Sequence, residues 1–175
     1  MYKRQFVYGA FAFIATHLHQ AHGLSLAAAG AVVMLFGFGG FLFATTSRWL
    51  VPRLGEPGLA RWGGMVMFAS LLAIALGPAW WWSVPACFAT GLGFYMMHNT
   101  LQTNATQMAP DMRGTSLALF ASCLFIGQSV GVALAALVVD RHGPAALFMI
   151  AMILLPLVAM GFARALRTRP AHHFS

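Results

Sequence analysis

Long apolar runs, separated by short polar or glycine-containing segments, divide this chain. A transmembrane helix needs about 20 mostly apolar residues, with a range of about 17 to 25. Six runs meet or approach this length, at about residues 6–22, 26–47, 62–77, 80–107, 114–139 and 144–164. The pattern predicts an all-α, polytopic integral membrane protein, with a six-helix transmembrane bundle over residues 6–167 and a cytoplasmic tail over residues 168–175.

The composition indicates that lipid, rather than water, surrounds these apolar runs. Hydrophobic residues make up 60% of the 175 residues, charged residues make up 7%, and the mean hydropathy is +0.77. A water-soluble domain usually carries about 25% charged residues, because its surface must be hydrated. The two cysteines, Cys87 and Cys123, lie inside apolar runs and indicate no disulfide framework.

The basic residues predict how the helices are oriented. With six spans, one side of the membrane receives both termini and the segments near residues 48–61 and 107–114. That side holds Lys3, Arg4, Arg48, Arg53, Arg61, Arg113, Arg164, Arg167 and Arg169. The other side holds Arg141 alone. Because cytoplasmic loops are enriched in Lys and Arg, we expect both termini to be cytoplasmic, in a bacterial inner (plasma) membrane. The scattered charges form no nucleic-acid-binding face.

Polar residues within the predicted spans concentrate in the fourth, whereas the third and sixth are almost purely apolar. Tyr95, Asn99, Gln102 and Thr106 have the spacing of neighbours on one helical face, and His98 flanks them. Polar groups at membrane depth are costly, so they mark solute pathways by default. We interpret these five residues as lining a substrate pathway. The alternative is that part of this stripe joins helices or lies beyond the bilayer.

Two residues outside the fourth span are added to the predicted pathway, His17 and Gln128. Two more histidines follow His17 in the first span, but residues two apart on a helix point to nearly opposite sides. No metal ion or other cofactor is therefore predicted. Gln128 lies between Gly127 and Gly131, and this G-x-x-x-G spacing predicts close helix packing.

Carboxylates are absent from the six predicted spans. If transport is coupled to protons, the carboxylate that carries the proton lies outside this chain, or His98 takes its place. Transport by the complete protein that stays pH-dependent in the His98→Gln variant would eliminate this role for His98.

A motif joins the fourth and fifth predicted spans. The segment Ala109-Pro110-Asp111-Met112-Arg113-Gly114-Thr115 resembles the A-P-x-x-R-G signature between the tenth and eleventh helices of major facilitator superfamily (MFS) transporters. Pro110, Arg113 and Gly114 are the residues that match it.

A second segment resembles the cytoplasmic G-x-x-x-D-R-x-G-R-[RK] loop of the same family. Arg53 and Gly55 match this pattern, whereas Pro52 replaces its Asp and Glu56 replaces a basic residue. These departures put the charge-relay role of the loop in doubt. The turns at residues 52–55 and 140–143 each follow the middle helix of a three-helix set.

The resemblance implies the C-terminal six-helix half of an MFS transporter, built as an inverted three-plus-three repeat. It implies transport of a small solute by alternating access, with the N-terminal six-helix half and the lipid bilayer as partners. An uncharged lining suits a neutral or hydrophobic solute and is compatible with efflux. No enzymatic activity is expected.

We further expect that the chain is a fragment. Tyr2-Lys3-Arg4-Gln5 is encoded by TAT AAG AGA CAG, which resembles the transposon end used to prepare sequencing libraries. Residues 1–5 are therefore predicted to be a scar. The alternatives are a half-transporter that acts as a homodimer and a membrane scaffold or assembly protein without transport activity.

Overall fold

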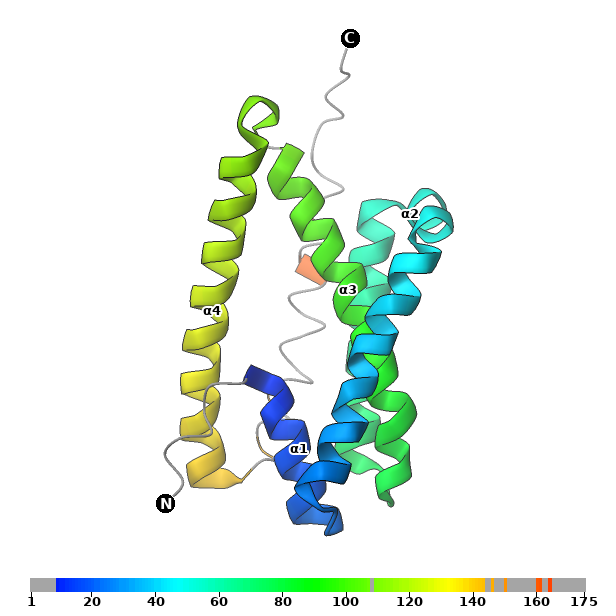
Figure 1. Cartoon of the computed structure of the whole chain (residues 1–175), viewed down its shortest axis with the longest axis vertical. Helices are drawn as coiled ribbons and strands as arrows, with labels where there is room; N and C mark the ends of the chain where they lie inside the picture. Colours follow the sequence, from blue (N-terminus) through cyan, green and yellow to red (C-terminus); the bar gives the residue numbers. More distant parts are fainter. Residues whose placement is uncertain are drawn as a thin grey trace.

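Helices account for the secondary structure of the described residues (Figure 1). The computed structural model describes residues 9–107 and 109–143, together with positions 146, 150, 160, 161 and 164. The elements are α1 (Gly9–His22), α2 (Leu26–Leu76), η2 (Trp80–Trp82), α3 (Ser83–Gln107), η3 (Pro110–Met112) and α4 (Arg113–His142). The prediction of an all-helical chain is confirmed for these residues. The predicted scar at residues 1–5, the predicted tail at 168–175 and nearly all of the predicted sixth span lie outside them.

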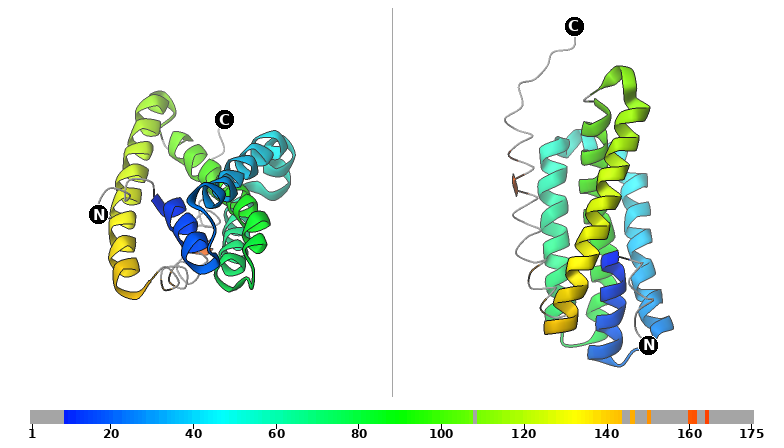
Figure 2. Two further views of the ribbon diagram at one scale, coloured as in Figure 1. Left: turned by 60° about the horizontal axis from the view of Figure 1, so that its bottom comes forward. Right: turned by 90° about the vertical axis from the view of Figure 1, so that its left-hand side faces the viewer.

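The 51-residue helix α2 is a hairpin of two antiparallel arms. Its backbone leaves the helical conformation at Gly55, which has φ 62° and ψ 174°, and the chain reverses there (Figures 1 and 2). This region of backbone space is open almost exclusively to glycine, because any side chain would be strained in it. We call residues 26–54 the first arm and residues 56–76 the second arm.

Residues 48–61, which the apolar pattern leaves between the second and third predicted spans, are thus helical apart from the turn at Gly55. Helix continues through this segment on both sides of Gly55, although Pro52 and Pro57 flank the turn. Pro57 lies in the first turn of the second arm, where a backbone N–H has no helical partner, whereas Pro52 lies in the last turn of the first arm and removes one helical hydrogen bond there. The sequence pattern suggested a loop because its charged residues and prolines are typical of one.

Local signals set the other helix ends. Gly23 has φ 67° and donates its N–H to the His19 carbonyl, which ends α1. The Ser25 side chain then caps α2 by accepting the Ala28 N–H at 3.2 Å. Gly143 ends α4 with φ 80° and ψ 169°, close to the conformation of Gly55. The two turns that the sequence paired, 52–55 and 140–143, thus end in glycines of similar backbone conformation.

The helix α3 lies between the two arms of α2 (Figure 2), and glycines bring the backbones together on both sides. On the side of the first arm, a Cβ at Gly39 would meet the Phe88 carbonyl oxygen, and one at Gly91 would meet that of Phe36. On the side of the second arm, a Cβ at Gly63 would lie 2.7 Å from the Gly93 carbonyl oxygen. We call these two contacts the glycine seams. Small residues let membrane helices approach closely in this way.

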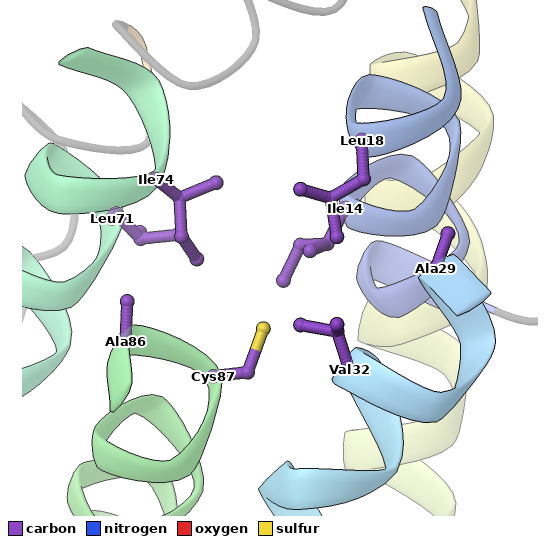
Figure 3. Packing of buried hydrophobic residues seen from close by; sticks show 8 residues of the cluster. All are labelled: Ile14, Leu18, Ala29, Val32, Leu71, Ile74, Ala86 and Cys87. Carbon is purple, nitrogen blue, oxygen red and sulfur yellow. The ribbon is translucent and has the colours of Figure 1, made fainter. Parts of the chain in front are cut away.

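A hydrophobic cluster holds four segments together at the end of the molecule that carries η2 (Figure 3). It consists of Ile14 and Leu18 from α1, Ala29 and Val32 from the first arm, Leu71 and Ile74 from the second arm, and Ala86 and Cys87 from α3. In contrast, none of the described side chains of α4 is buried. The described helices α1, α2 and α3 therefore form one packed unit, and α4 stands beside it (Figure 1).

Two of the described helices are long and apolar enough to cross a membrane by length and composition, namely Leu26–Leu76 and Arg113–His142. Many large apolar side chains on them are exposed, for example Phe41 at 68% and Leu119 at 65%. In water, so much exposed apolar surface would be unfavourable, whereas lipid solvates it. Because the 51-residue helix α2 is a hairpin, each of its two arms is long enough for one membrane crossing.

Candidate functional site

The helix α3 has two faces of different character. Its buried residues recur every three or four positions and face the α2 hairpin; they include Cys87, Thr90, Gly93, Met96, Thr100 and Asn104. The Thr90 and Thr100 hydroxyls donate to the carbonyls of Ala86 and Met96, four residues earlier, at 2.8 and 3.0 Å. These two hydroxyls on the packed face are thus satisfied within the helix itself.

The predicted pathway stripe lies on the opposite face of α3. Tyr95 is 37% exposed, and Asn99, Gln102 and Thr106 are half-buried. The Thr106 hydroxyl donates to the Thr103 carbonyl at 2.8 Å, whereas Asn99 and Gln102 make no side-chain hydrogen bond within the described part of the chain. Two amides on one half-buried face can donate to and accept from a solute or water. Their role in a pathway stays a prediction.

His98 sits among aromatic rings where α3 meets α4. Its ring stacks on Phe94 with a centroid distance of 5.6 Å and an interplanar angle of 11°. Phe120 of α4 lies 5.7 Å away, tilted by 47°, and Tyr95 lies 6.4 Å away, edge-on. Nδ1 of His98 is the buried side-chain nitrogen or oxygen that lacks a hydrogen-bond partner among the described residues.

The first arm of α2 extends this group of rings. Phe36 lies 5.4 Å from the Phe94 ring and 5.9 Å from the Tyr95 ring. Tyr95 also passes directly over Gly40, because a Cβ at Gly40 would overlap the tyrosine ring. The absence of a side chain at Gly40 therefore makes the room in which Tyr95 lies. We call Phe36, Phe94, Tyr95, His98 and Phe120 the aromatic group.

The remaining predicted pathway residues lie elsewhere. His17 is 7% exposed, hydrogen-bonds the backbone of Ile74 and meets the His22 ring edge-on at 5.9 Å, so it joins α1 to the second arm. Gln128 is exposed on α4. The structure thus brings His98 and the α3 stripe together on one helix, and it places neither His17 nor Gln128 in contact with them.

The predicted packing pair, Gly127 and Gly131, is exposed on α4. A Cβ at either position would meet no described atom within 4 Å. Close packing at this pair stays a prediction. Among the described residues, helices approach each other closely at the glycine seams between α2 and α3, which the sequence did not predict. The adjacent glycines Gly39-Gly40, Gly63-Gly64 and Gly91-x-Gly93 were the available signal for them.

The loop-motif residues lie at one end of the molecule, where the α2 turn and η3 are found (Figure 1). Gly55 makes the turn, and the Arg53 guanidinium lies 5.8 Å from the Trp49 ring centroid, as does that of Arg48. Pro110 begins η3, where its missing N–H costs nothing. Arg113 and Gly114 begin α4 and are exposed.

A hydrogen bond that sequence reasoning missed links this turn to α3. The Asn104 amide donates to the Glu56 carboxylate at 2.7 Å and to the Thr100 carbonyl at 2.9 Å. Glu56 begins the second arm, where a negative charge is favoured by the helix dipole. The replacement of a basic residue by Glu56, noted as a departure from the family loop, thus supplies the acceptor for a buried amide.

The His19 side chain, near the C-terminal end of α1, makes a local contact. His19 Nδ1 lies 2.6 Å from the Leu24 carbonyl oxygen, across the turn into α2. Among the described side chains, no group of three or more His, Cys, Asp or Glu residues is arranged to hold a metal ion. The expectation that no metal is bound stays a prediction.

Comparison with known proteins identifies the family. The chain matches the family model of the Major Facilitator Superfamily over residues 5–174. No curated protein and no solved structure matches the chain. The family match covers nearly the whole sequence and agrees with the helical architecture and the apolar, exposed helix surfaces described above. This chain therefore belongs to the major facilitator superfamily, a family of membrane transporters.

Proposed function

We propose that this chain forms one half of a secondary transporter that moves a small neutral or hydrophobic solute by alternating access. The observation that carries the proposal is the division of α3 into a packed face and a half-buried polar face. Asn99 and Gln102 on the polar face keep their amide groups available, although each unpaired amide in contact with lipid alone would be costly. A face that meets water and solute during transport removes that cost.

The backbone of the two paired turns supports the half-transporter arrangement. Gly55 and Gly143 adopt similar left-handed backbone conformations, and they follow the second and fifth predicted spans. Repeats of three helices with inverted topology would place equivalent turns at these positions, on opposite sides of the membrane. A binding site at the membrane midplane then requires a second six-helix unit. The N-terminal half of the transporter or a second copy of this chain would supply it.

The charge distribution supports a cytoplasmic location for the α2 turn and η3. Arg48, Arg53, Arg61 and Arg113 are exposed at or near these two segments. The opposite end carries the exposed indoles of Trp80, Trp81 and Trp82, together with Arg141. Clustered arginines favour the cytoplasmic side and tryptophans favour either interface. This orientation agrees with the expected location in a bacterial inner membrane, across which the solute would be exported or imported.

Cysteine accessibility tests whether the α3 polar face lines a pathway. Single cysteines replace Asn99 or Gln102 in a background with Cys87→Ala and Cys123→Ala, and the protein is kept in native membranes. We expect a charged, water-soluble thiol reagent to label both positions, and Thr100→Cys on the packed face to resist labelling. Equal protection of all three positions would contradict an aqueous pathway along α3.

Transport itself separates the proposal from a scaffold role. Asn99→Leu and Gln102→Leu together remove the amides without changing the packed face. If the chain acts in transport, these changes abolish solute flux by the assembled protein in proteoliposomes, while expression and helix content are retained. An assembly function that survives them unchanged would instead favour the scaffold.

A further inference from the structure

We infer that the aromatic group binds a planar aromatic solute that donates a hydrogen bond to His98 Nδ1. The inference rests on the proposed function, because it names the class of solute that would use this face of α3. It is carried by the ring geometry, by a nitrogen that has no hydrogen-bond partner among the described residues, and by the lack of charged residues in the sequence of α3 and of most of α4.

The rings belong to three segments that converge at one level of the bundle. Phe36 comes from the first arm, Phe94, Tyr95 and His98 come from α3, and Phe120 comes from α4. Successive centroids lie 5.4 to 6.4 Å apart, within the range in which aromatic faces and edges attract each other. A further flat ring can join such a group by stacking or edge contact, whereas an aliphatic solute gains only its apolar burial.

The unpartnered Nδ1 supplies a directional contact. Buried polar atoms in folded proteins nearly always have a hydrogen-bond partner, and one without a partner calls for a specific explanation. The rings of Phe94, Tyr95 and Phe120 lie around His98, and none of the described atoms makes a hydrogen bond with Nδ1. A solute N–H or O–H can satisfy Nδ1 when the imidazole carries its proton on Nε2.

The charge pattern favours a neutral solute. Residues 62–110 and 114–139, which contain α3 and most of α4, include no Lys, Arg, Asp or Glu. A carboxylate or ammonium group on the solute would lose its hydration here without meeting an opposite charge. A neutral ring with one donor avoids this cost.

One wall of the aromatic group can adapt to such a solute. Phe120 is carried by α4, none of whose described side chains is buried, whereas Phe94 and Tyr95 are carried by α3, which the glycine seams fix against α2. Tyr95 remains 37% exposed, so the group is open to its surroundings on one side. A solute can therefore separate the Phe120 ring from the His98 ring without disturbing the packed unit.

Binding of two isosteric probes to the full chain in lipid nanodiscs tests the inference. Indole carries a ring N–H, and 1-benzothiophene has a similar shape without a donor. We expect the His98→Phe variant, which keeps a ring and loses Nδ1, to bind indole roughly fivefold more weakly, the loss expected for one net hydrogen bond. Binding of 1-benzothiophene to this variant should be unchanged, which also shows that the variant is folded.

Two further variants separate stacking from general packing. Phe120→Leu should weaken both probes, and Phe125→Leu, on the same helix and 63% exposed, should weaken neither. Partition into empty nanodiscs is subtracted in each case. If His98→Phe and Phe120→Leu bind both probes as the parent chain does, the aromatic group is structural and the inference is overturned.

The outcome is independent of the transport assay. Solute flux that depends on Asn99 and Gln102, combined with probe binding that ignores His98, would overturn this inference and leave the proposed function standing. Probe binding that depends on His98, without solute flux by the assembled protein, would support the binding site and contradict transport.

Discussion

Gly37 and Gly39 are two residues apart in the first arm of α2, yet their surroundings differ. A Cβ at Gly39 would overlap the Phe88 carbonyl oxygen and lie 2.7 Å from the Leu92 backbone nitrogen. A Cβ at Gly37 would meet no described atom within 4 Å. The neighbours of Gly39 are backbone atoms, which cannot turn aside as a flexible side chain can, so only the helices themselves can move.

We therefore predict opposite effects of alanine at these two positions. Gly39→Ala should destabilise the chain by about 1–3 kcal/mol, as expected for overpacking. Gly37→Ala should be neutral or stabilise by about 0.5–1 kcal/mol, because alanine is the better helix former. Unfolding of the chain in mixed detergent micelles by added SDS measures both. Equal stabilities would show that the first glycine seam does not hold the helices together.

The hydrogen bond between Glu56 and Asn104 gives a second prediction for single residues. Glu56→Ala removes the acceptor and should cost about 1–2 kcal/mol, less than a fully buried charged bond because Glu56 is half-buried. Glu56→Gln keeps an oxygen acceptor and should recover most of the loss. The same SDS titration measures both variants. A Gln variant as unstable as the Ala variant would show that the interaction depends on charge and not on the acceptor.

At the scale of elements, the α2 turn depends on one backbone conformation. Gly55→Ala places a side chain at φ 62° and ψ 174°, so we expect a loss of about 1–3 kcal/mol. Gly143→Ala, at φ 80° and ψ 169°, should lose a similar amount. Gly30→Ala is the matched control, because a Cβ there meets no described atom within 4 Å. A loss at Gly55 without one at Gly143 would count against equivalent turns in the two repeats.

The sequence predicted the elements better than it predicted their contacts. The end of α1 at His22 and the hydrophobic character of the helices follow from the apolar runs and from glycine at the turn. The continuation of helix through residues 48–54 could not be read from the sequence, because charges and Pro52 are typical of loops. These residues can remain helical because the chain turns only after them, at Gly55. A single glycine sets the position of that turn.

In the candidate site, too, the sequence predicted the helical face but not the contacts between helices. Helical periodicity alone placed Tyr95, Asn99, Gln102 and Thr106 on one face of α3. It could not identify Phe120 as a neighbour of His98 or Phe36 as a neighbour of Tyr95, because the residues of each pair are more than 20 positions apart in sequence. Contacts between helices depend on their relative rotation, and the glycine seams set that rotation for α2 and α3.

At the scale of the whole molecule, the orientation in the membrane can be tested from the ends of α4. Asp111 and Arg141 are both exposed and lie near opposite ends of this helix. In a background with Cys87→Ala and Cys123→Ala, Arg141→Cys should react with an impermeant maleimide in intact cells. Asp111→Cys should react only after permeabilisation, because its segment is predicted to be cytoplasmic. The reverse labelling pattern would invert the proposed topology.

The position of α3 between the α2 arms also has a consequence for how the protein is inserted during its synthesis. Unlike α2 and α4, α3 is not among the described helices apolar enough to cross a membrane by composition. The α2 hairpin leaves the ribosome before α3 and already carries Gly39 and Gly63, which form the surfaces on which α3 docks. If α3 crosses the bilayer, as the sequence predicts, we expect its insertion to depend on a neighbour made earlier rather than on its own hydrophobicity. A substitution that disrupts a glycine seam would therefore act during synthesis. It would prevent α3 from leaving the translocon for the bilayer, before any folded protein exists.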